Sequence, residues 1–307
     1  MGAGPGTGGR WLSSNMRLRT LQKRLLECSH RVSLPVISRL LKKQDYRLRV
    51  NTKQNEGSAP AERDAQFQYL QAVQQEFRAS GQPVVSVDTK KKELIGDFKA
   101  SGQAWRQEAE RVNVHDFPSQ ALGRAVPYGI YDLARNQGTV YLGDSADTAE
   151  FAVDSLAGWC EHEMAEGYPQ ANRLLIHADC GGSNAHRCRL WKQQLQEKVA
   201  DRFGLDVTVC HYPTGCSKWN PIEHRLFSEI SKNWAGCPLR SFELMADYIQ
   251  DTRTDTGLVV RAHRIRRDYR KGQQISDEQM ASLALKPHRV CPQWNYTIHA
   301  RPSQMLA

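Results

Sequence analysis

The sequence predicts a mixed α/β protein in two parts, a small all-α segment followed by a larger domain built on a mixed sheet. A basic, helix-forming segment precedes a polar linker, and apolar strand-like runs then alternate with helical stripes. The 307 residues are enough for one large domain and a small one. The predicted parts are a flexible tail (1–10), a helical segment (11–50), a linker (51–63), a sheet domain (64–240) and a helical extension (241–307).

The first part carries the chain's excess positive charge. Residues 1–60 contain twelve Lys and Arg against three acids, so their net charge of +9 equals that of the whole chain. A basic charge confined to one small module suggests that this module binds a polyanion such as DNA. The alternative is a solvated basic face that serves only solubility.

Two short helices are predicted inside this basic part. Leu18, Leu21 and Leu25 recur at helical spacing, and after a break Ser33 can cap a second helix in which Ile37, Leu40 and Leu41 face inward. Two short helices joined by a tight turn predict a helix-turn-helix whose second helix lies in the major groove, although a plain helical hairpin fits the same pattern. The predicted DNA contacts are Arg39, Lys42, Lys43, Arg47 and Arg49.

From residue 64 onward the predicted elements follow one another in a definite order. They are a helix through Phe67 and Phe77, a strand at 84–87, strands at 128–133 and 140–142, a helix capped by Asp147, a strand at 174–178, a helix ending at Gly204, a strand at 205–211 and a helix from Asn220. The hairpin needs antiparallel strands and the later crossovers need parallel ones, so the sheet is mixed. This is also the order of elements in a ribonuclease H-like fold.

Three acids lie where such a fold places its functional carboxylates. Asp88 ends the first strand, Asp179 follows the fourth, and Glu223 lies in the first turn of a later helix. Three converging carboxylates repel one another unless a cation is present, and hard cations such as Mg²⁺ prefer carboxylate oxygens. Two Mg²⁺ or Mn²⁺ ions at such a site would stabilise the charges that develop during phosphodiester chemistry.

Each acid also has a structural interpretation. Asp88 can end a strand in a solvated turn, and Asp179 precedes a run rich in loop-forming residues. Glu223 can form a capping box with Asn220, which is a purely local role. The placement of all three acids on the expected elements favours the metal site.

Four lysines lie near these acids and are predicted to meet DNA phosphates: Lys90, Lys91, Lys92 and Lys218. Lysines beside a turn are otherwise usually just solvated. The eight cysteines include no Cys-x-x-Cys pair, so neither a disulfide framework nor a zinc ribbon is indicated. No stretch approaches the length of a membrane span and no signal-peptide core is present, so we expect a cytoplasmic protein with no membrane partner.

Several long stretches resemble the Rhodopirellula-type DDE transposases, a bacterial insertion-sequence family. The matching stretches are QPVVSVDTKKKELIGDF (82–98), VNVHDF (112–117), VPYGIYDLARN (126–136), LLIHADCGGSN (174–184), VCHYPTGCSKWNPIEHRLFSEISKNW (209–234) and WNYTI (294–298). The resemblance implies a DNA transposase that cuts element ends and joins the freed 3′-hydroxyl to target DNA. Asp88, Asp179 and Glu223 match the positions of its acidic triad.

The resemblance also implies duplex DNA as partner, a homo-oligomer on paired ends and a nucleoid-associated location in a bacterium. Members of the family have more sequence before the helix-turn-helix, so we expect an N-terminally truncated chain. Cys180 and Cys216 stand where the family has Gly and Thr. Two alternatives stay open: a transposase-derived DNA-binding protein or remnant without strand-transfer activity, and a nuclease of the same fold that acts on RNA–DNA hybrids.

Overall fold

A computed structural model describes residues 18–46, 62–114 and 118–302. The chain divides into two compact units, residues 1–57 and 58–307, and each is considered by itself. The predicted tail, most of the predicted linker, and Arg47 and Arg49 lie outside the described residues. Among the described residues, no helix has the length and apolar content required to cross a bilayer.

The first unit contains the two predicted helices, α1 (Leu18–Glu27) and α2 (Leu34–Lys43). Ser33 is the N-cap residue of α2 and proline lies in its first turn, but the Ser33 side chain makes no capping hydrogen bond. Ile37 is buried as predicted, whereas Leu40 was predicted to face inward and is 49% exposed. Two short helices bury little surface, so an apolar side chain on the stripe's margin stays in solvent.

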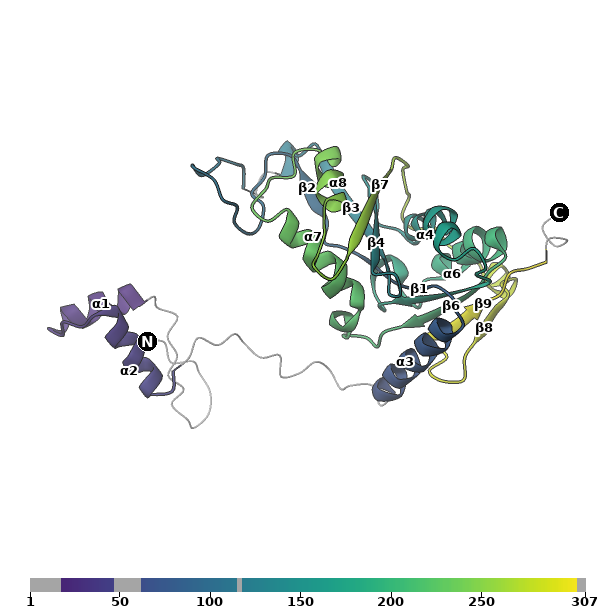
Figure 1. Cartoon of the computed structure of the whole chain (residues 1–307), viewed down its shortest axis with the longest axis horizontal. Helices are drawn as coiled ribbons and strands as arrows, with labels where there is room; N and C mark the ends of the chain where they lie inside the picture. The colour runs from purple at the N-terminus through teal and green to yellow at the C-terminus, as the bar shows by residue number, and fades with distance from the viewer. Residues whose placement is uncertain (1–17, 47–61, 115–117, 303–307) are drawn as a thin grey trace. The chain divides into compact units, whose positions relative to one another are not determined.

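The second unit is built on one mixed sheet (Figure 1). Its strands in the described part are β1 (Val84–Thr89), β2 (Glu93–Ile95), β3 (Gly123–Asp132), β4 (Gln137–Gly143), β5 (Arg173–Ala178), β6 (Asp206–His211), β7 (Val259–Ile265), β8 (Leu285–Pro287) and β9 (Asn295–Ile298). Their order is β7-β4-β3-β1-β5-β6-β9-β8, and β2 pairs with β3. The prediction of a mixed α/β fold is confirmed.

The five central strands have the pairing that the sequence predicted. β1, β3 and β4 are antiparallel neighbours, whereas β5 and β6 run parallel to β1. This is the hairpin-then-parallel arrangement expected of a ribonuclease H-like sheet. It brings the carboxyl ends of β1 and β5 to the same edge, with Val87 paired to Ala178.

Helices cover both faces of the sheet, and each face has its own hydrophobic core (Figure 1). One face packs against α4 (Ala149–Trp159) and α6 (Arg189–Leu195) with its continuation η4 (Gln196–Asp201). The other packs against α3 (Arg63–Ala79), η6 (Glu223–Phe227) with α7 (Ser228–Asn233), and α8 (Phe242–Gln250). The shorter helical segments are η1 (Pro118–Gln120), η2 (Cys160–Met164), α5 (Ala165–Gly167), η3 (Gly182–Asn184), η5 (Ser217–Trp219) and α9 (Asp277–Ala281).

Two predictions of secondary structure were wrong. The N-cap residue of α4 is Thr148 and not Asp147, because the Thr148 hydroxyl accepts from Phe151 N at 3.2 Å. The predicted helical extension at 241–307 also contains β7, β8 and β9, which widen the sheet at both ends. β7 and β8 are the edge strands, and charged residues such as Arg261 and Lys286 interrupt their apolar pattern.

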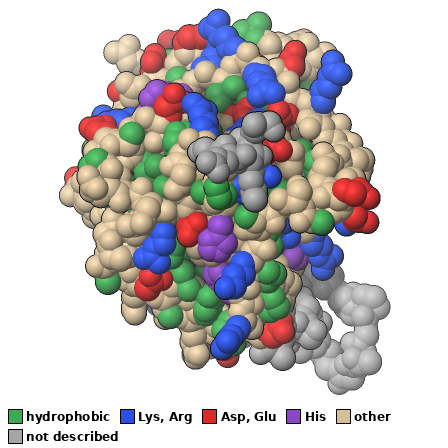
Figure 2. All heavy atoms as spheres, turned by 90° about the vertical axis from the view of Figure 1, so that its right-hand side faces the viewer, with side chains coloured by type: hydrophobic (Ala, Val, Ile, Leu, Met, Phe, Trp, Pro, Cys, Tyr) green, Lys and Arg blue, Asp and Glu red, His purple; other side chains and the backbone are tan. Residues whose placement is uncertain are grey.

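The charges of the second unit are mixed. Figure 2 shows a face on which Lys and Arg side chains are interspersed with Asp and Glu, as expected from the near-neutral composition after residue 60. Many of these charges pair with each other. No broad basic surface is visible on this face.

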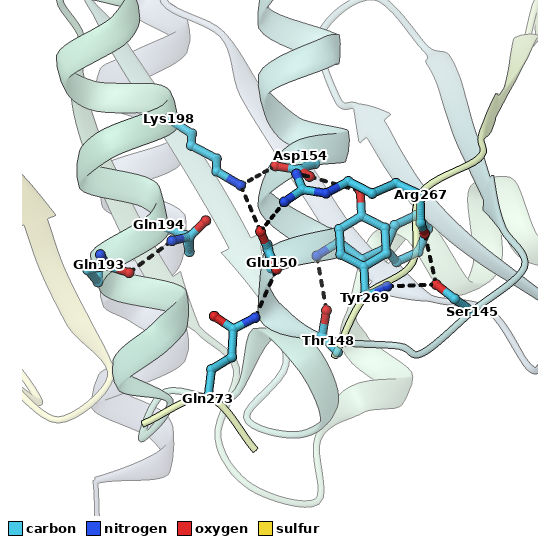
Figure 3. A network of polar contacts seen from close by, with 11 residues as sticks. Ser145, Thr148, Glu150, Asp154, Gln193, Gln194, Lys198, Arg267, Tyr269 and Gln273 are labelled. Atoms are coloured by element: carbon cyan, nitrogen blue, oxygen red, sulfur yellow. Dashed lines mark hydrogen bonds and ion pairs between the residues drawn. The ribbon is translucent and has the colours of Figure 1, made fainter. Parts of the chain in front are cut away.

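One cluster of pairs attaches the segment after β7 to α4 (Figure 3). Asp154 accepts from Lys198 at 2.5 Å, from Arg267 at 2.7 Å and from the Tyr269 hydroxyl at 2.8 Å. Glu150 accepts from Lys198 and Arg267 as well. Because several donors share each carboxylate, the C-terminal segment is bound firmly to the outer face of this helix.

Candidate active site

The three predicted acids lie on different elements that meet at one edge of the sheet. Asp88 belongs to β1, Asp179 follows the last residue of β5, and Glu223 is the first residue of η6. β1 and β5 are parallel neighbours, so Asp88 and Asp179 leave the sheet side by side. All three acids are partly buried.

The carboxylates interact strongly. Burial, followed by the charge of Asp179, raises the pKa of Asp88 to about 8, although a hydrogen bond from Thr89 N opposes this shift and Glu223 adds to it. Burial also raises the pKa of Asp179 to about 6, and the Glu223 charge contributes. The Glu223 charge thus raises the pKa of both aspartates. The site therefore concentrates negative charge in a place with little solvent.

The oxygen atoms at this site suit a divalent cation. Asp88 Oδ1 accepts from Thr89 N at 2.7 Å, whereas the buried Asp179 Oδ1 has no hydrogen-bond partner among the described residues. A buried carboxylate oxygen without a partner is costly unless a cation or water satisfies it. Among the described residues, no group of three or more metal-binding side chains forms a preformed metal site.

Buried polar contacts position the Glu223 helix on β1. Ser86 donates to Asn220 Oδ1 and accepts from Ile222 N at 3.1 Å, while Asn220 Nδ2 donates to the Val87 carbonyl at 3.1 Å. The side chain of Asn220 thus forms hydrogen bonds with β1 and does not cap its own helix. The capping-box interpretation of Glu223 is contradicted on this point, and Glu223 faces Asp88 instead.

Two glycines let this helix approach the sheet. Gly129 lies opposite Asp88 in the β1–β3 pair, and a Cβ there would lie 2.5 Å from Phe227 and 2.9 Å from Ile222. At Gly138 a Cβ would lie 2.4 Å from Leu226. η6 is itself a single π turn, a local widening of the helix that often occurs at functional sites.

A second polar chain, which the sequence did not indicate, supports Asp179. Trp191 Nε1 donates to the Tyr296 hydroxyl at 3.0 Å, so the hydroxyl hydrogen is available to His211 Nε2 at 3.3 Å. His211 Nδ1 then carries the hydrogen donated to the Asp179 carbonyl at 2.8 Å. Burial lowers the pKa of His211 to about 3, so the imidazole is neutral. These residues come from α6, β9, β6 and the end of β5, so no local pattern signals them.

Tyr128 was also missed. Its buried hydroxyl donates to Asn184 Oδ1 at 2.9 Å beneath the acids. Burial raises its pKa, and the charges of Asp88, Asp147 and Asp179 raise it further, which places it close to the site. A tyrosine inside an apolar strand gives no sign of this position.

The predicted DNA-binding residues differ in their surroundings. Arg39, Lys42 and Lys43 are exposed on α2, in the first unit. Near the acids, Lys91, Lys92 and Lys218 are exposed, with Lys92 paired to Asp147 at 3.2 Å and Lys218 over the Trp219 ring.

Lys90 departs from the prediction of a phosphate contact. It is only 8% exposed, and its ammonium lies 4.7 Å from the Trp234 ring centroid and 3.7 Å from Glu93. Its pKa is lowered by burial, while Glu93 and Glu223 oppose this. Lys90 is therefore a packed residue beneath the site. Lys90 precedes the exposed Lys91 and Lys92, so the local sequence does not indicate that its side chain is buried.

Fold and site together define a class, namely α/β proteins with a mixed sheet and a cluster of interacting carboxylates at the strand ends. Within that class, the chain belongs to the family described as Rhodopirellula transposase DDE domain, which matches residues 6–300. The resemblance inferred from the sequence is thereby confirmed. No curated protein sequence gives a match.

Solved structures similar to the chain include the Mos1 transposase paired-end complex with left transposon end, with a TM-score of 0.45. Others are the mariner Mos1 paired end complex with Mg, with a TM-score of 0.47, and the corresponding complex with Mn, with a TM-score of 0.46. Each is 12% identical in sequence, and the alignments cover 80% of this chain and 73% of the other.

Proposed function

We propose that this protein is a DNA transposase that cuts the ends of its element and joins the freed 3′-hydroxyl to target DNA. The observation that carries the proposal is the convergence of Asp88, Asp179 and Glu223, with one buried oxygen of Asp179 unpartnered among the described residues. Membership in a transposase family supports DNA as the substrate.

Asp88, Asp179 and Glu223 would hold two Mg²⁺ or Mn²⁺ ions. Bound there, the ions would supply charge stabilisation to the attacking and leaving oxygens of a phosphodiester. The chain contributes the geometry. The sheet presents Asp88 and Asp179 at adjacent strand ends, and Ser86 with Asn220 holds the start of the Glu223 helix against the same strand.

DNA binding is divided between the two units in this proposal. The exposed Arg39, Lys42 and Lys43, on a helix with a buried apolar side, suit a helix-turn-helix that recognises element ends, and Arg47 and Arg49 extend the same basic run. Lys91, Lys92 and Lys218 suit phosphates close to the acids. We expect a homo-oligomer to pair two ends.

The test is cleavage of a labelled duplex that carries the element end, in Mg²⁺ or Mn²⁺. Glu223→Gln removes one carboxylate with little change of shape. Glu229→Gln is the matched control, because Glu229 lies further along the same helical segment, where its carboxylate pairs with the exposed Lys232 at 2.6 Å and accepts from the Ser228 hydroxyl at 3.5 Å. We expect metal-dependent cutting by the intact chain and by Glu229→Gln, and none by Glu223→Gln.

Two other results have clear meanings. Specific binding without cutting by the intact chain would replace the proposal by the transposase-derived DNA-binding protein. Preferential cutting of RNA–DNA hybrids would replace it by a hybrid nuclease, since hybrid recognition rests on backbone shape and needs no major-groove helix.

A further inference from the structure

A cavity of about 420 Å³ opens beside the loop that follows Asp179. Its lining residues come from three parts of the second unit and are His186, Arg187, Lys192, Thr214, Gln293 and Trp294. The lining includes two permanent cations, an imidazole, a hydroxyl and an amide, and it contains no carboxylate. This composition provides hydrogen-bond donors for an anion.

The two cations of the cavity lack acidic partners. Among the described residues, neither Arg187 nor Lys192 forms an ion pair, whereas the neighbouring Arg189 pairs with Asp277 at 2.6 Å. Lys192 is partly buried, with its ammonium 5.1 Å from the Tyr296 ring centroid. Two cations without acidic partners among the described residues therefore line one cavity.

The cations also converge on one imidazole. Arg187 Nε donates to His186 Nε2 at 3.2 Å. The pKa of His186 is lowered by burial first, and then by the charges of Arg187 and Lys192. Like charges that approach each other at the mouth of a cavity are stabilised when an anion binds between them.

The cavity is next to the candidate active site. The His186 ring contacts the His211 ring edge to face, with 6.0 Å between centroids, and His211 Nδ1 donates to the Asp179 carbonyl at 2.8 Å. A single imidazole thus separates the cavity wall from the backbone of Asp179. Thr214 lies three residues beyond His211, on the chain segment that leads to Glu223.

We propose that this cavity binds a backbone phosphate of the DNA close to the phosphate that is cut. The inference rests on the proposed function, because it takes DNA as the substrate. Arg187 and Lys192 supply the charge, the Thr214 hydroxyl supplies a neutral donor, and Trp294 forms an apolar wall. The Gln293 amide donates to Glu62 at 2.7 Å and closes one side of the cavity. Occupation of the cavity would fix the register of the strand relative to Asp88, Asp179 and Glu223.

The experiment measures binding of the element-end duplex by the full chain as a function of salt, with Arg187→Leu and Lys192→Met. Each substitution should reduce the slope of log K against log salt by about 0.7–0.9, which is a loss of roughly five- to eightfold in affinity at 0.1 M salt. Lys271→Met is the matched control, because Lys271 is exposed and forms no ion pair among the described residues. Unchanged melting temperatures would show that all three variants fold.

Single methylphosphonates, which remove one phosphate charge at a time, locate the contact. At one position near the cut they should weaken binding by the intact chain and by Lys271→Met, but not by Lys192→Met.

If Arg187→Leu and Lys192→Met resemble Lys271→Met while the intact chain binds and cuts DNA, the inference is overturned and the proposed function stands. If the intact chain does not bind DNA, both are overturned. If inorganic phosphate binds in the cavity but no methylphosphonate distinguishes the variants, the cavity is a site for free phosphate and the inference is again overturned.

Discussion

Replacing Gly129 by alanine tests whether contact between the Glu223 helix and the sheet positions the proposed catalytic glutamate, Glu223. The new Cβ would lie 2.5 Å from Phe227 Cε1 and 2.9 Å from Ile222 Cδ1. Carbon atoms in ordinary contact are about 3.5–4.0 Å apart. Either the helix or its side chains must therefore move by about 1 Å. Glu223 is the residue after Ile222, so a movement of the helix also displaces Glu223.

The magnitude follows from two effects. Overpacking of this kind costs about 1–3 kcal/mol of stability, and a loss of 2 kcal/mol lowers the melting temperature of a domain of this size by roughly 4–8 °C. A displacement of about 1 Å at a catalytic group lowers the rate by as much as about 100-fold. We therefore expect cleavage to fall much more than the folded fraction at 25 °C.

The assay combines thermal unfolding with metal-dependent cleavage of the element-end duplex. Gly123→Ala is the matched control on the same strand, because its Cβ would meet Phe242 at 3.5 Å, an ordinary contact. Adding Phe227→Leu to Gly129→Ala removes the closest clash and should restore part of both properties. If Gly129→Ala unfolds and cuts like Gly123→Ala, the reasoning about helix approach is wrong.

Three further perturbations test separate parts of the structure. Asp88→Asn should abolish cleavage and raise the melting temperature of the metal-free protein, because it removes a carboxylate that its neighbours repel. The pKa of Asp88 is raised to about 8. The protonated Asp88 side chain therefore contributes fully to the stability of the metal-free protein below about pH 4, and this contribution is lost as the pH rises through 8. Melting curves measured across this pH range should show a smaller loss of stability in Asp88→Asn. Ser86→Ala leaves Ile222 N without its acceptor, which should cost about 1–3 kcal/mol in denaturant unfolding and should lower cleavage further than that loss of stability explains. Asp154→Ala removes the carboxylate that accepts from both Arg267 and Tyr269 in Figure 3, and it should cost about 2–3 kcal/mol of stability. Glu161→Ala, which breaks an exposed pair with Arg202, should change stability by less than about 1 kcal/mol. Equal melting temperatures for these two variants would contradict the role given to Asp154.

The sequence predicted the central strands and the three acids because both leave local signals. Apolar runs such as 84–87 and 174–178 end at an acid, and they lie within the observed strands Val84–Thr89 and Arg173–Ala178. The contacts that support the acids leave no such signal. His211 and Tyr296 are 85 residues apart, and Ser86 and Asn220 are 134 apart. Their roles depend on strand pairing and on helix docking, which no local pattern contains.

Lys90 and Asn220 show how a local rule fails beside a site. Three consecutive lysines after a strand are normally solvated, yet the first of them packs under Trp234 because the chain turns inward at that point. An asparagine before a helix normally caps it, yet Asn220 bonds to Ser86 and Val87 on another strand. In both cases a tertiary contact replaces the local one, and both residues lie next to an acid of the triad.

The acids themselves are held together against their mutual repulsion, and the fold must supply the energy for this. Each is fixed from outside the site: Asp88 by its place in the sheet, Asp179 through the hydrogen bond from His211 to its carbonyl, and Glu223 through the helix that Ser86 anchors. None of these contacts uses the carboxylate oxygens that would bind a cation. The arrangement therefore keeps the acids close together at a cost in stability. Neutralising one acid should thus stabilise the metal-free protein, whereas cutting one of the outside contacts should destabilise it, although both changes lower activity.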